Sequence, residues 1–388
     1  MKNFKFHRYI ILLLFACCYS ISLYSQHSPY TITLLTISPG EEIYSTFGHS
    51  ALRVINHQTG QDYVYNYGTF DFDEPMFYWK FIKGKLPYSL SRIPTQYAFR
   101  NLVKEHRTAI ENKLNLSETE ELNLVRNLEI NYLPKNRNYY YDFFYDNCAT
   151  RILAITDSSI FQRHIVHNTA YIPQSFKKLV NPYLRHLPWA KLGIWILMGK
   201  EGNRKANYQQ SAFLPDYLKS YLKNNYSEKD ECLLGRDTTI VKSEAQTYSI
   251  HFFSPLSITI LLALAILGLT IFQKKTSNAL FVIDKLLFWI TALLSLLIIS
   301  LWVISNHSIY AWNANLLWLI PYPFLGILIR LKANNKITSI IVLLLFGTGI
   351  IYVLTQITTC PAIVLICFSI AIRFYQKIKF SGLFPNIL

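Results

Sequence analysis

Two side chains that stand far apart in the sequence, Cys148 and His49, have the types needed for a nucleophile and its base. Cys148 directly follows Asp146-Asn147 and opens a stretch that is typical of a helix. In the first turn of a helix, unpaired N–H groups and the helix dipole favour thiolate over thiol. His49 stands in Phe47-Gly48-His49-Ser50, at the entry to a β-rich run that would fix the direction of its imidazole. The pair predicts covalent catalysis by a cysteine.

A third residue usually orients the imidazole of such a pair. Asn66, on the strand expected after His49, is the first choice for this role, and Asp71 or Asp73 is the second. Asn and Asp near a turn are more often plain turn residues. Asp71 is also a candidate substrate contact.

Purely structural roles for Cys148 and His49 stay open. A lone histidine beside a strand is usually a partly buried structural residue. Cys148 could instead form a disulfide with Cys232, the other cysteine of the same region, in an oxidising compartment. Cys232 lies in a charged stretch, 228–231, without a comparable helix start. No His-x-x-x-His or Cys-x-x-Cys spacing occurs in this region, so we expect neither a metal site nor a cofactor.

The elements that must position these residues can be predicted from short-range patterns. Tyr30–Ile37, Ala51–Ile55 and Asp62–Tyr67 are β-rich runs closed by turn residues, which predicts a meander of short strands. Ser117, with Glu120 three residues later and leucines at helical spacing, predicts a capped helix. Strands followed by helices indicate the α+β class.

The N-terminus predicts export. Positive charges lie within residues 1–8, an apolar run extends from Ile10 to Ser22, and Gln26 would begin the mature chain, so residues 1–25 are expected to be a signal peptide. A lipoprotein signal ending at Cys17 fits less well, because the bulky Phe15 stands where a small residue is expected. An uncleaved anchor is the remaining alternative, and either form exports the chain from residue 26 onward.

Apolar stretches dominate the chain after residue 254 and predict five bilayer spans. They run over approximately 255–272, 281–304, 314–330, 337–354 and 359–375. The loops after the first, third and fifth stretches are basic, and the other two carry no Lys or Arg. Because positive loops face the cytoplasm, residues 26–254 are expected outside, and 255–388 form a helical membrane domain with a cytoplasmic C-terminus. Asp284 and Lys285, at the cytoplasmic start of the second stretch, are expected to be anchors rather than a proton relay.

Composition agrees with this organisation. Hydrophobic residues make up 51% of the 388 residues and charged residues 16%, which is too apolar for an ordinary soluble protein or a disordered chain. The formal net charge of +15 would suggest a nucleic-acid partner. Every acidic residue except Asp284 lies within 26–255, however, and the positive excess flanks the apolar stretches. We therefore expect membrane contact and no nucleic acid.

The segments around His49 and Cys148 resemble the N-terminal periplasmic domain of the Lnb family, bacterial lipoprotein N-acyltransferases. The resemblance covers most of residues 30–220, and the multi-span second half, with Trp312–Trp318 after an outside loop, also fits the family. Its motifs lie at 38–40, 47–54, 66–72, 81–84, 141–151, 188–189 and 213–218.

The resemblance implies a nucleophile at Cys148 and a base at His49. The order of histidine before cysteine is similar to a permuted papain-type fold, as in NlpC-like peptidases, so a papain-like exported domain is expected. One departure concerns the segment after Leu197-Met198-Gly199. An Asp-Arg pair is expected there, and Asn203-Arg204 stands in its place, which puts the role of a carboxylate there in doubt.

The resemblance further implies a reaction at the bacterial inner membrane. A fatty acyl chain would move from a phospholipid, through a cysteine thioester, to the N-terminal amine of a diacylglyceryl lipoprotein. Five spans suit a substrate that is itself lipid or arrives in the bilayer plane. Arg53, Arg151, Asn313 and Asn315 are candidate substrate contacts, although ion pairs and helix caps are simpler roles for them.

Two alternatives belong to other classes. A membrane-anchored NlpC-like cysteine amidase or peptidase acting on the cell wall would use the same pair with water. In a membrane scaffold or sensor, Cys148 and His49 would have no catalytic role.

Phe77–Lys85 has the aromatic and basic composition of an interfacial segment. Membrane contact and an ordinary core helix are about equally favoured for it.

Overall fold

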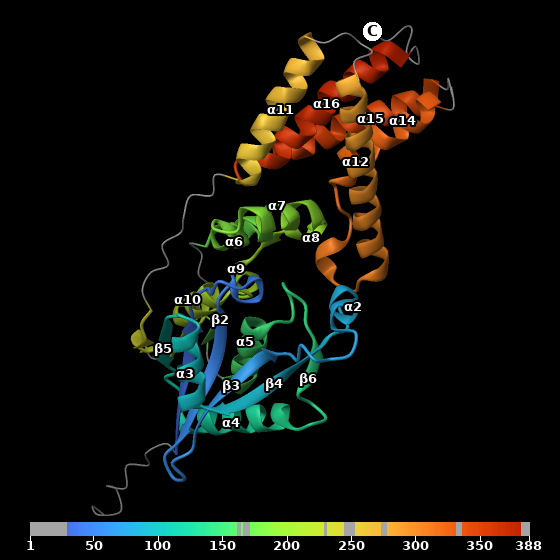
Figure 1. Cartoon of the computed structure of the whole chain (residues 1–388). Helices are drawn as coiled ribbons and strands as arrows, with labels where there is room; N and C mark the ends of the chain where they lie inside the picture. The colour runs from blue at the N-terminus through green and yellow to red at the C-terminus, as the bar shows by residue number, and fades with distance from the viewer. Residues whose placement is uncertain are drawn as a thin grey trace, which may run out of the picture.

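The structure, a computed structural model, describes residues 29–160, 164–165, 171–228, 231–243, 253–272, 278–330 and 336–381. The predicted signal peptide, residues 1–25, lies outside the described residues. The described chain divides into a part built on a β-sheet and a part built from helices (Figure 1).

A seven-stranded sheet, antiparallel between all neighbours, forms the centre of the first part. Strands β1 to β4 are consecutive both in sequence and in the sheet, which confirms the predicted meander. β2 begins at His49 rather than at Ala51, so the candidate base is itself a strand residue. In spatial order the strands are β12 (Thr238–Val241), β5 (Ala109–Lys113), β1 (Tyr30–Ile37), β2 (His49–Asn56), β3 (Asp62–Thr69), β4 (Pro87–Pro94) and β6 (Asn138–Tyr140).

Helices cover both faces of this sheet, because successive strand residues point to opposite faces and both sets are apolar. Ile32 and Leu34 are fully buried in the cluster that includes α4 and α5, whereas Leu35 and Ala51 are buried on the opposite side against Phe99. The helices on the first face are α4 (Glu118–Tyr132), α5 (Cys148–Ser159) and α10 (Pro215–Asn225), and α3 (Thr95–Lys104) lies on the second.

The capped helix predicted after Ser117 is confirmed. Ser117 Oγ accepts the N–H of Glu120, and Glu120 Oε2 accepts the N–H of Ser117 at 2.8 Å, so two otherwise unpaired donors are satisfied reciprocally. The predicted α+β class of the exported region is likewise confirmed.

Several short elements complete this part. They are η1 (Ile43–Ser45), α2 (Phe77–Ile82), β7 (His164–Ile165), β8 (Gln174–Ser175), α6 (Phe176–Val180), η2 (Asn181–Leu184), α7 (Pro188–Leu197), α8 (Lys200–Asn203), β9 (Lys205–Ala206), α9 (Tyr208–Ser211), β10 (Tyr226–Glu228) and β11 (Glu231–Cys232). In Figure 1, α6, α7 and α8 lie between the sheet and the helical part.

Among the described residues of the helical part, three helices are long and apolar enough to cross a bilayer: Pro255–Phe272, Asn278–Ile304 and Pro361–Lys379. The apolar helices Leu316–Ile327 and Ile340–Leu354 are shorter than the spans predicted there. The elements are α11 (Pro255–Phe272), α12 (Asn278–Ile304), η3 (Ser308–Tyr310), α13 (Leu316–Leu319), α14 (Pro321–Arg330), α15 (Lys336–Leu354) and α16 (Pro361–Ser381).

Asp284 forms an ion pair within the helical part. Its carboxylate binds the Arg373 guanidinium of α16 through two hydrogen bonds of 2.8 and 3.0 Å, and it accepts the Tyr322 hydroxyl at 3.0 Å. Arg373 is only 7% exposed, and the remaining Nη1 donates to Thr270 of α11. A charge inside a helical bundle is stable only when paired, so this ion pair ties α11, α12, α14 and α16 together.

Candidate active site

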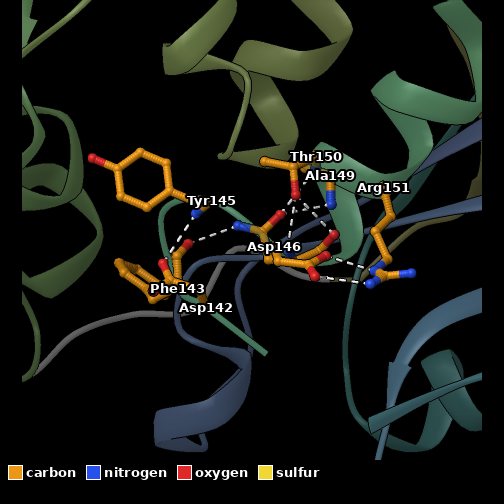
Figure 2. Close-up of polar contacts among 8 residues, drawn as sticks. Asp142, Phe143, Tyr145, Asp146, Ala149, Thr150 and Arg151 are labelled. Carbon is orange, nitrogen blue, oxygen red and sulfur yellow. Dashed lines mark hydrogen bonds and ion pairs between the residues drawn. The ribbon is translucent and has the colours of Figure 1, made fainter. Parts of the chain in front are cut away.

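Cys148 is the first residue of α5, as predicted. Asn147 caps the helix: its Oδ1 accepts the N–H groups of Ala149 (2.9 Å) and Thr150 (3.0 Å). Its Nδ2 donates to the carbonyls of Phe143 (2.8 Å) and Phe213 (3.0 Å), so the buried amide is fully used. Figure 2 shows polar contacts of the loop that leads into α5, among them the ion pair of Asp146 with Arg151. The capped start holds the thiol at the positive end of the helix dipole.

His49 is the first residue of β2 and pairs with Ile37, the last residue of β1. Gly48 precedes it with a φ of 76°, and a Cβ there would lie 2.8 Å from the Ile37 carbonyl oxygen, so a side chain does not fit. On the next strand, β3, Asn66 Oδ1 accepts a hydrogen bond of 2.5 Å from His49 Nε2. This contact leaves Nδ1 of the ring for a second partner.

Cys148 is the neighbour on the other side of the ring: its thiol lies close enough to His49 that each group shifts the pKa of the other. Gly68, with a φ of 93°, closes the site: a Cβ there would lie 4.0 Å from both Cys148 Cβ and His49 Cε1. β2, β3 and α5 thus bring Cys148, His49 and Asn66 together, in the order thiol, imidazole, amide.

Each member of the pair shifts the protonation of the other. Burial raises the pKa of Cys148, but the facing His49 charge, the hydrogen bond to His49 and the N–H groups of Ser50 and Ala149 outweigh it, so the pKa falls below its ordinary value. Burial lowers the pKa of His49, and the Cys148 charge together with hydrogen bonds to Cys148 and Asn66 reverses this, so its pKa is raised. Both shifts favour a thiolate facing an imidazolium.

The disulfide alternative is wrong. Cys148 is a free, buried cysteine, and Cys232 is free and exposed on β11. A buried histidine of purely structural role is also a poor description of His49, because it lies next to the Cys148 thiol at the start of α5.

Tyr139 of β6 is a site residue that sequence reasoning missed. Its side chain is 8% exposed, and its hydroxyl has no hydrogen-bond partner among the described residues. A Cβ placed on Gly68 would lie 3.9 Å from that oxygen and 4.0 Å from both Cys148 Cβ and His49 Cε1, so Tyr139 borders the same point as the cysteine and the histidine. Burial raises the pKa of Tyr139, so the phenol stays a neutral hydrogen-bond donor. The available signal was the tyrosine run at 139–141 just before the cysteine loop.

Arg151 lies one helical turn after Cys148 but is engaged elsewhere. Its guanidinium binds both carboxylate oxygens of Asp146 (2.6 and 2.8 Å) and stacks over the Tyr139 ring at 3.5 Å. Arg151 and Asp146 also line a cavity of about 430 Å³ with Tyr67. Arg151 therefore supports the site and the adjacent cavity while its charge is balanced.

Arg53 is not brought to the pair. Four residues along β2 from His49, its guanidinium binds Asp62 (2.6 and 2.8 Å) and Glu111 (3.0 Å). Asp71 is exposed and caps a turn by accepting the Asp73 N–H at 2.9 Å, so Asn66 takes the place next to His49 for which Asp71 was the second choice.

Asn313 and Asn315 are buried structural residues rather than open contacts. Asn313 Nδ2 donates to the carbonyls of Ile196 and Leu197, at 2.8 and 2.9 Å. Asn315 Nδ2 donates to the carbonyls of Trp195 and Ile196, at 3.0 and 2.9 Å. Together they satisfy carbonyl groups at the end of α7 that the helix itself leaves unpaired.

Although Asn203-Arg204 stands where the family resemblance implies an Asp-Arg pair, a carboxylate does lie close to Arg204. Glu201 forms an ion pair with Arg204 (3.1 Å) and accepts the Tyr145 hydroxyl, which in turn accepts a hydrogen bond from Arg204. Tyr145 belongs to the loop before Cys148, so Glu201 steadies that loop from α8.

A loop of the helical part also contacts the loop before Cys148. Ser308, between α12 and α13, donates its hydroxyl to Asp142 Oδ2 at 2.9 Å, and Asp142 Oδ1 accepts the N–H of Phe144 at 2.9 Å. The backbone of residues 309–311 accepts hydrogen bonds from Gly199 and Lys200 of the exported part, at 2.7 and 2.9 Å. No cluster of three or more His, Cys, Asp or Glu side chains able to hold a metal occurs among the residues described.

Two models of one protein family match separate parts of the chain. Residues 24–181 match the family model described as the Lnb N-terminal periplasmic domain, and residues 246–381 match the Lnb transmembrane domain. No curated protein and no solved structure matches the chain.

Proposed function

The chain belongs to the Lnb family and is a multi-pass membrane protein with a periplasmic domain, and from that premise we propose that it is a lipoprotein N-acyltransferase of the bacterial inner membrane. The acyl donor is a phospholipid, and the acceptor is the N-terminal amine of a diacylglyceryl lipoprotein. The observation that supports the proposal most is the close approach of Cys148 at the start of α5 to His49, whose Nε2 is hydrogen-bonded to Asn66.

In the first step the Cys148 thiolate attacks the carbonyl carbon of a phospholipid ester. The C–S bond forms as the C–O ester bond breaks, and the His49 imidazolium gives its proton to the departing glycerol oxygen. The products are a thioester on Cys148 and a lysophospholipid. Asn66 supports the step by holding the ring through Nε2, so that Nδ1 faces the sulfur.

In the second step the lipoprotein amine attacks the thioester carbonyl. The C–N bond forms, neutral His49 accepts the amine proton, and the C–S bond breaks to release the Cys148 thiolate. The thiolate–imidazolium pair that began the cycle is thereby restored, without any external oxidant or reductant.

Two groups suit the oxyanion that forms in each step. The backbone N–H of Cys148 lies at the start of α5, where the helix dipole also favours negative charge. The unpartnered Tyr139 hydroxyl is a second donor next to Gly68. A donor of this kind contributes about 3 kcal/mol to transition-state binding in comparable sites.

The papain-like architecture implied by the sequence resemblance is part of this proposal. The nucleophile starts a helix that packs on an antiparallel sheet, and the base starts a strand of that sheet. A cell-wall amidase of the NlpC-like kind would share this arrangement. The hydrogen bond from Ser308 of the helical part to the loop before Cys148 favours a substrate that is presented at the membrane.

Mass spectrometry of a reporter lipoprotein tests the proposal. Full-length enzyme in phospholipid vesicles should convert the diacylglyceryl reporter into a form with a third, amide-linked acyl chain at its N-terminus. Cys148→Ser and His49→Ala should each abolish the conversion at unchanged protein level. Tyr97→Ser, at an exposed position on α3, serves as the matched control and should keep it. A reporter that stays diacylated with the unmodified enzyme, while a peptidoglycan stem peptide is cleaved, would establish the amidase instead.

A further inference from the structure

Large aromatic side chains are gathered on one exposed surface of the periplasmic domain. Tyr44, Phe72 and Tyr78 are 61%, 61% and 77% exposed, and every residue of α2 is at least partly exposed. The rings are in mutual contact: Tyr44 with Phe72 at 6.4 Å, Phe72 with Phe77 at 5.1 Å and Phe77 with Tyr78 at 5.3 Å between centroids. The surface, called here the aromatic patch, consists of Ile43, Tyr44, Phe70, Phe72, Met76, Phe77, Tyr78, Trp79 and Phe81.

The aromatic patch lies against the outer end of the longest membrane helix. Asn306, just after α12, donates its backbone N–H to the Lys83 carbonyl at 3.0 Å, and His307 Nε2 lies 2.9 Å from the Phe81 carbonyl oxygen. Figure 1 shows α2 at that end of α12. The patch and α12 are therefore held as neighbours by hydrogen bonds between the two segments.

The outer end of α12 coincides with the expected lipid boundary. From Asp284, at the cytoplasmic side, to Ile304 there are about 20 residues, or about 30 Å of helix, which is the thickness of a hydrocarbon core. Val303 is 77% exposed, so the helix remains apolar and uncovered up to this end. Trp302 and Trp312 pack at 4.8 Å between centroids, as tryptophans do in the interfacial belt. The aromatic patch therefore sits at headgroup depth.

Charges of both signs surround the aromatic patch: Glu41, Glu42, Asp71, Asp73 and Glu74 are close to its residues in sequence, and Lys80 forms an ion pair with Glu74 at 2.5 Å. The contact with a phospholipid headgroup therefore falls to Lys83 and Lys85. Lys80, Lys83 and Lys85 belong to α2 and the turn after it, and Lys83 lies 4.7 Å from the Trp79 ring centroid. Lysines beside exposed aromatic rings are typical of surfaces that enter the interface, where ammonium groups meet phosphate and rings meet acyl chains. Exposed apolar patches of this kind usually mark an interaction site.

A row of contacting rings leads from the aromatic patch toward Cys148. Phe70 contacts Tyr88 at 5.3 Å, and Tyr88 stacks on Tyr141 at 4.7 Å and lies 6.4 Å from Tyr139. The Tyr139 hydroxyl and Cys148 Cβ lie 3.9 and 4.0 Å from the same point, the position of a Cβ on Gly68. These ring contacts connect the aromatic patch with the surroundings of Cys148.

We propose that the aromatic patch inserts into the outer leaflet and that the Phe70–Tyr88–Tyr141 row receives an acyl chain of a leaflet phospholipid and guides it to Cys148. This inference rests on the proposed function and deepens it, since it assigns the donor to the leaflet that the patch enters. The ligand is a two-chain phospholipid within a bilayer, and the recognition elements are aromatic ring faces with lysines at their rim.

Photo-crosslinking tests the lipid contact without turnover. The full-length Cys148→Ser protein is placed in bilayer nanodiscs of phosphatidylethanolamine and phosphatidylglycerol that contain a phospholipid with a diazirine in its acyl chain. After illumination, peptide mass spectrometry should find label in residues 70–88 as well as in the membrane helices. Label confined to residues 255–381 would overturn the proposal.

Matched variants connect the patch to transfer. Tyr78→Asp places a charge at the most exposed ring of α2 and should lower both the labelling of residues 70–88 and the rate of reporter acylation about tenfold. Tyr97→Asp, half-exposed on α3 at the opposite face of the sheet, should leave both unchanged. Equal rates for Tyr78→Asp and the unmodified enzyme would overturn the guiding role.

The experiments distinguish a failure of the acyltransferase proposal from a failure of the lipid-binding surface. Labelling of residues 70–88 by a protein that never acylates the reporter would keep the lipid-binding surface and remove the acyltransferase. Acylation by the unmodified enzyme without labelling of those residues would keep the acyltransferase and remove the lipid-binding surface.

Discussion

Cys148 and His49 favour each other's charged form, and this is the central feature at the scale of single residues. Burial alone would keep the thiol protonated, because a buried anion without a partner is costly. The imidazolium and two backbone N–H groups reverse that preference. Asn66 holds the ring without adding a charge, so the sulfur keeps the imidazolium as its counter-ion.

Alkylation of Cys148 as a function of pH should reveal this pairing. Because the thiolate is the reactive form and the pKa of Cys148 is lowered, iodoacetamide should modify it at pH values below the usual range for a thiol. His49→Ala removes the opposing charge and leaves burial dominant, so the midpoint of the alkylation profile should move to higher pH. Peptide mass spectrometry of the full-length protein measures the profile.

Cys232 is an internal control for the same experiment. It is free and exposed, and its alkylation profile should be identical in the unmodified protein and in His49→Ala. A Cys148 profile that did not move on loss of His49 would mean that the imidazole does not act on the sulfur.

At the scale of elements, glycines at two strand ends make the approach of Cys148 and His49 possible. Gly48 turns the chain into β2 with a φ of 76°, and Gly68 leaves β3 with a φ of 93° next to Cys148. Both conformations are in the region that L side chains rarely adopt. The capped start of α5 then supplies the third side of the site.

Gly48→Ala should destabilise the protein more than Gly60→Ala. Both glycines have positive φ, which costs an alanine about 1–2 kcal/mol. The Cβ introduced by Gly48→Ala would in addition lie 2.8 Å from the Ile37 carbonyl oxygen. A Cβ at Gly60 would meet nothing within 4 Å among the described residues. Thermal unfolding of full-length protein, followed by tryptophan fluorescence, measures the difference, and the rate of Cys148 alkylation reports on the site. Equal unfolding temperatures for the two variants would contradict the close contact at Gly48.

At the scale of the whole molecule, the two parts share one apolar cluster. Phe176 and Trp195 of the exported part are fully buried in the same cluster as Trp318 and Tyr322 of the helical part. The loop at 305–315 adds polar contacts from both sides, including the hydrogen bond of Ser308 to the loop before Cys148. The membrane helices therefore help to hold the site in place.

Asn315→Ala should lower stability without raising the KM for the lipoprotein. Asn315 is 1% exposed, and its loss leaves the Trp195 carbonyl and the Trp318 indole N–H buried without this partner. Each orphaned group costs about 1–3 kcal/mol. Thermal unfolding and reporter acylation measure the two effects. Asn224→Ala, at an exposed asparagine of α10, should change neither. A raised KM at unchanged unfolding temperature would instead assign Asn315 to substrate binding.

The sequence by itself determined the features that depend on short stretches of chain. A cysteine after Asp146-Asn147 predicts a thiol at a helix start, Ser117 with Glu120 predicts a capping box, and alternation predicts the strands of the meander, because capping and periodicity involve residues within one or two turns. The apolar stretches after residue 254 and the basic loops between them likewise indicated a membrane domain.

Only the tertiary structure decided which distant side chains meet. Asn66 rather than Asp71 orients His49, Arg53 is taken by two carboxylates, and Tyr139 joins the site. Asn315 caps α7, and Asp284 pairs with Arg373 of α16. These outcomes depend on strand register and on how segments far apart in the sequence pack. A shift of one residue would turn each strand side chain to the other face, so no local pattern contains them.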